Sequence, residues 1–238
     1  MKRWMLAGAL TVLATGALAD AAADLQKKLA ERLGPTAQVE VEKTPIKGLL
    51  QVIADGQVFY MTEDGRYLFK GQLLDLKTRQ DLSEPALRKA RIRLLRSLPA
   101  DLTITYPAKG KQKREIWVFD DLDCPYCRKL HKVFPRLQAA GVTIHVLFFP
   151  RNGLGSPSYY GAIRVWCSKD RRKAFDEAMD TGQAPTDGQV CRHPINRHLA
   201  LAQKLNVTGT PYMFLDDGEV IPGFVPPKKL IEFLTAGR

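Results

Sequence analysis

The stretch EIWVFDDLDCPYCRKLH, residues 115–131, places a short strand directly before a pair of cysteines. Its first part, Glu115–Phe119, is a mostly apolar run that predicts a buried strand. Cys124 then lies where a helix N-cap is expected, and Pro125 lies at the first helical position, which proline favours. Unpaired N–H groups and the positive end of the helix dipole would face the Cys124 sulfur and favour its thiolate. The stretch therefore predicts a nucleophilic sulfur at the start of a helix.

The second cysteine supplies a partner for the first. Cys127 follows Cys124 by three residues on the same face of the predicted helix, close enough to form a disulfide, and we expect it to be the more buried of the two. This asymmetry would let Cys124 attack and Cys127 resolve the product of that attack. Nearby carboxylates oppose the thiolate, so the sequence alone does not set its pKa. These carboxylates belong to Asp120, Asp121 and Asp123.

A C-x-x-C motif also occurs in zinc sites, in haem attachment sites and as a plain structural disulfide. Haem attachment requires His directly after the second cysteine, where this chain has Arg128. A four-cysteine zinc site usually contains a second close pair, whereas Cys167 and Cys191 lie 24 residues apart. The motif therefore favours redox chemistry that uses no metal and no other cofactor, and a metal-binding domain stays as the last alternative.

Cys167 and Cys191 form a second pair. Four cysteines allow three pairings, and a redox dithiol that pairs locally leaves these two for each other. Their bond would close a 25-residue loop and stabilise the fold by roughly 3 kcal/mol in the chain-entropy model. We interpret this pair as a structural disulfide, with a regulatory role as the alternative.

From Thr103 onward the pattern alternates between strands and helices, which is typical of parallel βαβ pairing. After the first strand the expected elements are a helix over Cys124–Ala140, a strand over Val142–Phe149, helices between Tyr159 and Leu205 with a break near residues 181–193, two strands over Tyr212–Leu215 and Val220–Phe224, and a closing helix over Lys228–Leu234. This order predicts an α/β thioredoxin-like domain with a helical insertion over residues 101–238.

Gly209-Thr210-Pro211 comes directly before a predicted strand, where a thioredoxin-like domain carries its cis-proline loop. Most X-Pro bonds are trans, but this position predicts a cis bond between Thr210 and Pro211. Such a bond would expose the backbone of Thr210 beside the dithiol, where an extended client segment could pair with it. We therefore expect Thr210 and Pro211, together with Pro125 and Tyr126, to support the active site.

Residues 20–81 predict a small α+β domain. The expected elements are a helix over Ala22–Leu33 and four short strands over Gln38–Lys43, Leu49–Ala54, Gln57–Thr62 and Arg66–Leu74, with Asp-Gly turns at 55–56 and 64–65 between the last three strands. Exposed strand edges in so small a unit invite pairing with a second copy. Residues 82–100 then predict an amphipathic linker helix, for which Ser83 is a candidate cap and Pro99 the stop, with a helix packed wholly within one domain as the alternative.

The first 19 residues have the layout of a signal peptide: Lys2 and Arg3, an uncharged stretch over Trp4–Leu18, and a small-x-small site that predicts cleavage after Ala19. A membrane anchor is the alternative, but about 15 apolar residues fall short of the roughly 20 that cross a bilayer, so we expect no stable membrane insertion. Export would place the mature chain in an oxidising compartment. The formal net charge of +11 lies on a helix and in loops without interleaved aromatic residues, which argues against a nucleic-acid partner.

Over nearly all of its mature length the chain resembles the DsbC/DsbG family of periplasmic disulfide isomerases. The stretches that carry the resemblance are Val118-Phe119 through Cys124-Pro125-Tyr126-Cys127 to Leu130-His131, Trp166 to Asp170, Gly209-Thr210-Pro211, Val220 to Phe224 with Pro226-Pro227, and Tyr60 to Gly65. The resemblance implies a homodimer joined through cystatin-like N-terminal domains of the α+β class. It also implies misfolded disulfide-containing exported proteins as clients, chaperone-like client binding, and an inner-membrane donor of the DsbD type that keeps Cys124 and Cys127 reduced.

Two details of the resemblance point to different branches of the family. The second cysteine pair matches the DsbC branch, in which it is a structural disulfide, whereas the inner dipeptide Pro125-Tyr126 is typical of DsbG. Two alternatives to an isomerase therefore stay open. One is a reductase of single sulfenylated cysteines as in the DsbG branch, and the other is a holdase whose cysteines are incidental.

Overall fold

The computed structural model describes residues 16–34, 39–186 and 190–236. The chain divides into two compact units, and the boundary along the sequence lies between Ser83 and Glu84. Most of the predicted signal peptide, residues 1–15, lies outside the described residues. Within the described ranges, no helix combines the length and the apolar character needed to cross a membrane.

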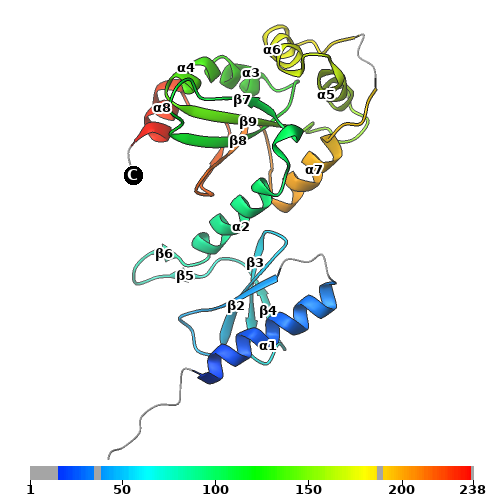
Figure 1. The fold of residues 1–238 in the computed structure, drawn as a ribbon. Helices are drawn as coiled ribbons and strands as arrows, with labels where there is room; N and C mark the ends of the chain where they lie inside the picture. The colour runs from blue at the N-terminus through cyan, green and yellow to red at the C-terminus, as the bar shows by residue number, and fades with distance from the viewer. Residues whose placement is uncertain (1–15, 35–38, 187–189, 237–238) are drawn as a thin grey trace, which may run out of the picture. The chain divides into compact units, whose positions relative to one another are not determined.

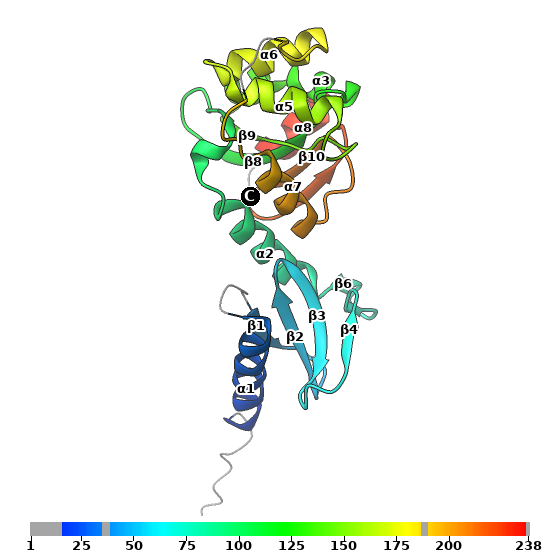
Figure 2. The same ribbon diagram turned by 90° about the vertical axis from the view of Figure 1, so that its right-hand side faces the viewer.

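The first unit is one helix and a four-stranded antiparallel sheet with the order β1-β2-β3-β4. Its elements are α1 (Gly16–Leu33), β1 (Val39–Lys43), β2 (Leu49–Ala54), β3 (Gln57–Thr62) and β4 (Leu68–Lys70). Helix α1 lies against one side of the sheet (Figures 1 and 2), and Leu25 packs there among Val39, Leu50 and Val52. Asp55 and Gly56 both take positive φ between β2 and β3, as a two-residue hairpin turn of this kind requires.

The fourth predicted strand is shorter than expected. The sequence suggested Arg66–Leu74, but pairing with β3 ends at Lys70, and β4 is exposed along its length. A separate two-stranded ribbon follows, with β5 (Leu74–Asp75) and β6 (Gln80–Asp81). The chain turns after β5 because the Asp75 carboxylate accepts hydrogen bonds from the N–H groups of Lys77 and Thr78. This turn prevents the chain from continuing as one long strand.

Helix α2 (Glu84–Arg96) packs on the second unit. Leu95 is buried in a cluster with Trp117, Phe119 and Phe214. The apolar side of the amphipathic helix therefore packs against the sheet of the second unit. The hydroxyl of Ser83, the candidate cap, instead pairs with the hydroxyl of Tyr60 at 2.7 Å and accepts the N–H of Leu73.

The second unit is built on a five-stranded mixed sheet with the order β11-β10-β8-β9-β7. Its strands are β7 (Ile104–Tyr106), β8 (Arg114–Asp120), β9 (Val142–Phe148), β10 (Tyr212–Leu215) and β11 (Val220–Pro222). Its other helices are the 3-10 turn η1 (Ala100–Leu102), α3 (Pro125–His131), α4 (Phe134–Ala139), α5 (Pro157–Cys167), α6 (Arg171–Thr181), α7 (Ile195–Lys204) and α8 (Pro227–Thr235). Strands β8 and β9 pair in parallel, whereas the β7–β9, β8–β10 and β10–β11 pairs are antiparallel. This arrangement confirms the predicted fold class.

Strand β8 divides its side chains between two apolar clusters, one on each face of the sheet. Ile116 and Val118 belong to the cluster under α3 and α4, whereas Trp117 and Phe119 belong to the cluster under α2 and α7. Figure 1 shows these helices on opposite faces of the sheet. Because side chains alternate along a strand, the last residue of β8, Asp120, continues the series that faces α3.

The helix predicted over residues 124–140 is in fact two helices. The helix α3 ends at His131 and α4 begins at Phe134. Pro135 explains the break, because it has no N–H to donate to the carbonyl four residues earlier and its ring clashes with that carbonyl. The helical insertion is present as α5, α6 and α7, and Cys167 at the end of α5 is bonded to Cys191 before α7.

Candidate active site

The two free cysteines lie at the junction of β8 and α3. Cys124 is the N-cap of α3 and Pro125 opens the helix, as the sequence predicted. The sulfur of Cys124 accepts a hydrogen bond from the backbone N–H of Cys127, with 3.4 Å between the N and Sγ atoms. The helix therefore directs one of its unpaired N–H groups at this sulfur.

A segment far away in the sequence completes the site. The Thr210–Pro211 peptide bond is cis, and the carbonyl oxygen of Thr210 lies 3.3 Å from the Cys124 sulfur, where it accepts a hydrogen bond when that sulfur is protonated. Strand β10 places this loop there, because Tyr212 pairs with Phe119 near the end of β8. The loop is tied to the following hairpin by the N–H of Gly223, which donates to the carbonyl of Pro211 at 2.8 Å.

Both cysteines are buried. Cys124 is 1% exposed and Cys127 is 0% exposed, so Cys127 is the more buried by only a small margin, and Cys124 is itself almost fully covered. The cis-proline loop contacts the Cys124 sulfur directly. A client sulfur must displace part of this cover before it meets Sγ of Cys124.

The surface beside the dithiol is aromatic. Tyr126, between the two cysteines, is 53% exposed. Its ring lies 6.1 Å from the ring of Phe224, and the ammonium group of Lys129 lies 5.0 Å from the Tyr126 ring centroid. Apolar surface of this kind suits contact with an unfolded client segment.

The environment separates the pKa values of the two thiols. The pKa of Cys124 falls to about 5, mainly because the Cys127 thiol donates to its thiolate, with further help from backbone N–H groups. Burial raises the pKa of Cys127 far above that of an ordinary thiol. At neutral pH the structure thus holds one thiolate and one thiol, which are the forms that a nucleophile and its resolving partner need.

The three aspartates before Cys124 have three different environments. Asp123 is exposed, and the buried Asp121 accepts hydrogen bonds from the side chain of Arg151 at 2.8 Å and from its backbone N–H. Asp120 is 0% exposed, and neither of its carboxylate oxygens has a hydrogen-bond partner in the described structure. Burial raises the pKa of Asp120 to about 7. Period-two alternation from Ile116 could have located this side chain, but only the fold shows that nothing pairs with it.

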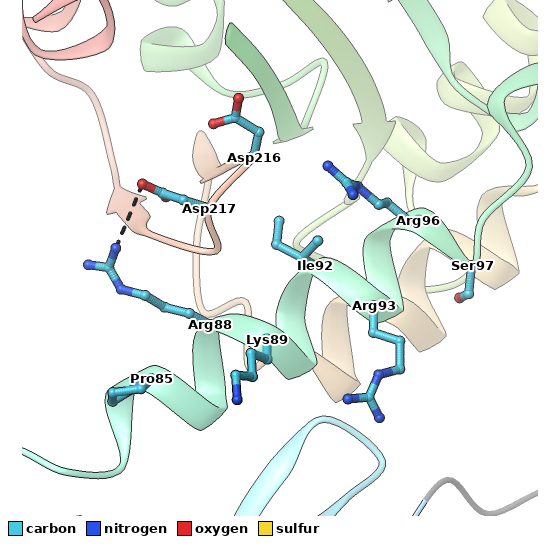
Figure 3. A pocket seen from close by; sticks show the side chains of 9 residues that line it. All are labelled: Pro85, Arg88, Lys89, Ile92, Arg93, Arg96, Ser97, Asp216 and Asp217. Carbon is cyan, nitrogen blue, oxygen red and sulfur yellow. Dashed lines mark ion pairs between the residues drawn. The ribbon is translucent and has the colours of Figure 1, made fainter. Parts of the chain in front are cut away.

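Other features of the unit lie apart from the dithiol. The Cys167–Cys191 disulfide belongs to the helical insertion, and among the described residues no group of His, Cys, Asp and Glu side chains is arranged to hold a metal ion. A groove along α2 carries basic side chains and includes an ion pair between Arg88 and Asp217 at 3.8 Å (Figure 3). Neither cysteine of the dithiol lines this groove.

Comparison with known proteins places this site in a family. The family described as the disulfide bond isomerase protein N-terminal domain matches residues 16–84, and the family described as a thioredoxin-like domain matches residues 104–238. A thiol:disulfide interchange protein DsbC from Dickeya dadantii is 36% identical over 240 residues, which cover 100% of this chain and 97% of that protein. The chain belongs to the DsbC family.

Further relatives agree with this assignment. The DsbC of Escherichia coli K12 is 34% identical over 233 residues, which cover 98% of this chain and 95% of that protein. The crystal structure of a disulfide interchange protein from Neisseria gonorrhoeae superposes with a TM-score of 0.51 at 28% identity, covering 58% of this chain and 99% of that one. DsbC relatives are thiol:disulfide interchange proteins by name, and membership in their family confirms the resemblance noted in the sequence.

Proposed function

We propose that this DsbC-family chain is a periplasmic thiol:disulfide isomerase and reductase that rearranges non-native disulfides in exported proteins. The observation that carries the proposal is the Cys124 sulfur at the N-cap of α3, where its pKa is lowered to about 5 beside a thiol that stays protonated. This dithiol performs the exchange without a metal or other cofactor.

The reaction begins when the Cys124 thiolate attacks a client disulfide. A bond forms between Cys124 and one client sulfur, and the other client sulfur leaves as a thiolate. A different client thiolate then displaces Cys124, which leaves the client with a rearranged disulfide and restores the enzyme. If no client thiol arrives, Cys127 attacks Cys124, the client leaves reduced, and the dithiol is left oxidised.

The neighbours of the dithiol have supporting roles in this proposal. Pro125 starts the helix that directs N–H groups at Cys124, and Tyr126 offers an exposed ring to the client. Thr210 and Pro211 form the loop against which an extended client segment would pair. The Cys167–Cys191 disulfide has a structural role in the insertion.

We propose the following organisation for the whole protein, which family membership supports. Removal of residues 1–19 after Ala19 delivers the chain to the periplasm; residues 20–81 form the cystatin-like dimerisation domain, residues 82–100 the linker helix and residues 101–238 the catalytic domain. Two copies form a homodimer that binds misfolded clients in a chaperone-like manner. An inner-membrane reductant of the DsbD type returns the dithiol to its reduced form.

A second function is favoured by one observation. The inner dipeptide Pro125-Tyr126 is the one seen in the DsbG branch, so the same Cys124 attack could be directed at single sulfenylated cysteines. The client would then be released by Cys127 in every cycle, because no other client thiol is at hand. A holdase with incidental cysteines is the remaining alternative.

Trapping of clients tests these functions against one another. The Cys127→Ala variant should accumulate mixed disulfides through Cys124, whereas the double variant that also carries Cys124→Ser should accumulate none. Because the Cys127 thiol contributes most to the low pKa of Cys124, the trap is best set near pH 8. Captured proteins with several cysteines support the isomerase, and captured proteins with a single cysteine support the sulfenic acid reductase. Unchanged refolding activity in Cys124→Ser would leave only the holdase.

A further inference from the structure

The loop that joins β7 to β8 carries positive charge without a counter-charge. Lys109, Lys111 and Lys113 are exposed, and none of the three takes part in an ion pair within the part of the chain that the structure describes. The sequence has no acidic residue from Leu102 to Arg114. Like charges this close repel one another, and a carboxylate among them would relieve the repulsion. The loop therefore gathers charge that the protein itself does not neutralise.

The fold holds this loop in a fixed place. The Thr143 hydroxyl accepts the N–H of Ala108 at 3.1 Å and donates to the side chain of Gln112 at 2.5 Å. The N–H of Lys109 donates to the carbonyl of Gln138, near the end of α4, at 2.8 Å. The loop is thus fastened to β9 and to α4, and its lysines are left on the solvent side. Their closeness is a property of the fold and not of a loose segment.

Helix α4 extends this basic surface. Arg136 is exposed on the helix against which the loop packs, and it has no ion pair among the described residues. Two neighbouring cations do not count toward the surface. Arg114 is paired with Asp216 at 2.5 Å, and Lys132 shares a hollow with the carboxylate of Asp176. The surface that we call the basic edge consists of Lys109, Lys111, Lys113 and Arg136.

The basic edge has no apolar anchor. The large apolar side chains that the described part of the second unit exposes are Tyr126, Leu154, Tyr160, Val190 and Phe233, and none of them belongs to the β7–β8 loop or to α4. A specific protein interface normally buries aromatic or aliphatic anchors at its centre. A diffuse anionic surface needs no such anchor, because it attracts a group of lysines and arginines through charge alone.

We propose that the basic edge binds the anionic headgroups of a phospholipid bilayer and holds the protein at the membrane surface without insertion. Clusters of at least about four Lys or Arg side chains are bound by anionic lipid, and each further cation adds to the attraction. Free phosphate offers the same chemistry, but it meets few of these cations at once, whereas a bilayer presents a plane of charge to all of them.

The binding goes beyond the function proposed above and does not depend on it. Its use does rest on that function. A dithiol that an inner-membrane reductant resets would meet this reductant more often if the catalytic unit were concentrated at the same surface. Because the attraction is electrostatic, it would leave the protein free to return to its clients.

Co-sedimentation with lipid vesicles tests the basic edge. The mature protein is mixed with vesicles made of equal parts of phosphatidylglycerol and phosphatidylcholine, or of phosphatidylcholine alone. We expect binding to the anionic vesicles at about 50 mM salt, binding at least about 10-fold weaker at about 500 mM salt, and none to the neutral vesicles. The variant Lys109→Glu/Lys111→Glu/Lys113→Glu should bind the anionic vesicles at least about 10-fold more weakly than the wild type.

A matched variant separates the basic edge from net charge. Lys27→Glu/Lys77→Glu/Lys169→Glu changes the net charge by the same amount through three exposed lysines that are scattered over the chain, and it should lose less than about threefold in binding. If the glutamates disturb the loop, glutamine at positions 109, 111 and 113 should still weaken binding. Alkylation of Cys124 should be equal in all these proteins. A wild-type dithiol that fails to exchange disulfides would refute the proposed function and leave the vesicle result as it stands.

Three results would overturn the proposal. The first is a wild-type protein that does not bind anionic vesicles at low salt. The second is an equal loss of binding in the clustered and the scattered variant, which would assign the attraction to net charge. The third is retention on immobilised poly-glutamate without binding to the vesicles, which would assign the basic edge to an acidic protein.

Discussion

At the scale of single residues, the pKa values of the two thiols depend on the groups that surround each sulfur. Cys124 and Cys127 have the same chemistry and lie three residues apart, yet the structure separates their pKa values widely. The difference arises because donors converge on the Cys124 sulfur, while Cys127 is buried with a carboxylate beside it. The resulting pair of one thiolate and one thiol has a direct signature in the pH dependence of alkylation.

We expect the alkylation rate of Cys124 in the reduced protein to be half of its plateau near pH 5, the pKa that its hydrogen bonds produce. The sign follows from the lowered pKa: the thiolate is present above pH 5 and is lost as the pH falls through that value, whereas an ordinary thiol loses it near pH 8.5. Iodoacetamide labelling followed by mass spectrometry between pH 3 and pH 9 measures this curve.

A matched pair of variants tests the cause of the shift. Cys127→Ala removes the largest contribution to the low pKa of Cys124 and should move the inflection to higher pH. Asp123→Asn alters an exposed carboxylate next to Cys124 and should move it little. An inflection near that of a free thiol in the wild-type protein would contradict the account of the site.

At the scale of elements, the site depends on turns that hold the strand carrying the cis-proline loop. The β10–β11 turn contains Asp216, Asp217 and Gly218, and it packs against α2. Gly218 has a φ of +81°, and a Cβ there would lie 2.6 Å from the Cα of Arg88. Gly223, beyond β11, has a φ of +82° with open space around it. These two glycines share nearly the same positive φ but differ in the space around them.

Gly218→Ala should therefore destabilise the second unit more than Gly223→Ala does. We expect Gly223→Ala to cost roughly 1–2 kcal/mol through backbone strain alone, and Gly218→Ala to cost more because the backbone of α2 must move away. Urea denaturation of both variants measures the difference in the free energy of unfolding. Equal costs would show that α2 does not press on this turn in solution.

At the scale of the whole molecule, the first unit leaves apolar side chains at a sheet edge. Strand β4 ends the sheet, and Tyr67, Leu68 and Phe69 are each more than half exposed there. An exposed apolar edge strand is a site for pairing with another chain. In the proposed homodimer this edge belongs to the dimer interface.

Leu68→Lys together with Phe69→Lys should convert the dimer to a monomer, because two charges would be buried at the interface. Sedimentation equilibrium measures the change in mass. Alkylation of Cys124 should stay unchanged, since these residues belong to the other unit. The matched control is Leu76→Lys, which replaces an exposed apolar residue in the β5–β6 turn and should leave the mass unchanged. A doubly substituted protein that is still dimeric would exclude this edge from the interface.

The sequence by itself determined most of the elements and the reactive pair, because those signals are local. Cys124 and Pro125 define the start of α3, alternation defines β8, and the redox motif leaves Cys167 to pair with Cys191. The sequence also contains Pro135, which explains the break between α3 and α4, but we predicted a single helix over residues 124–140 and missed that break. Local patterns sufficed there because hydrogen bonds and side-chain contacts within an element join residues only a few positions apart.

Only the tertiary structure decided how deeply the two cysteines are buried and which groups surround their sulfurs. Thr210, 86 residues from Cys124 in the chain, contacts the Cys124 sulfur, and Cys124 is 1% exposed. The burial of Asp120 without a partner likewise depends on α3 closing over β8. A pKa follows from burial and from the donors and charges that distant segments bring together, and these are quantities that neighbouring residues in the sequence do not fix.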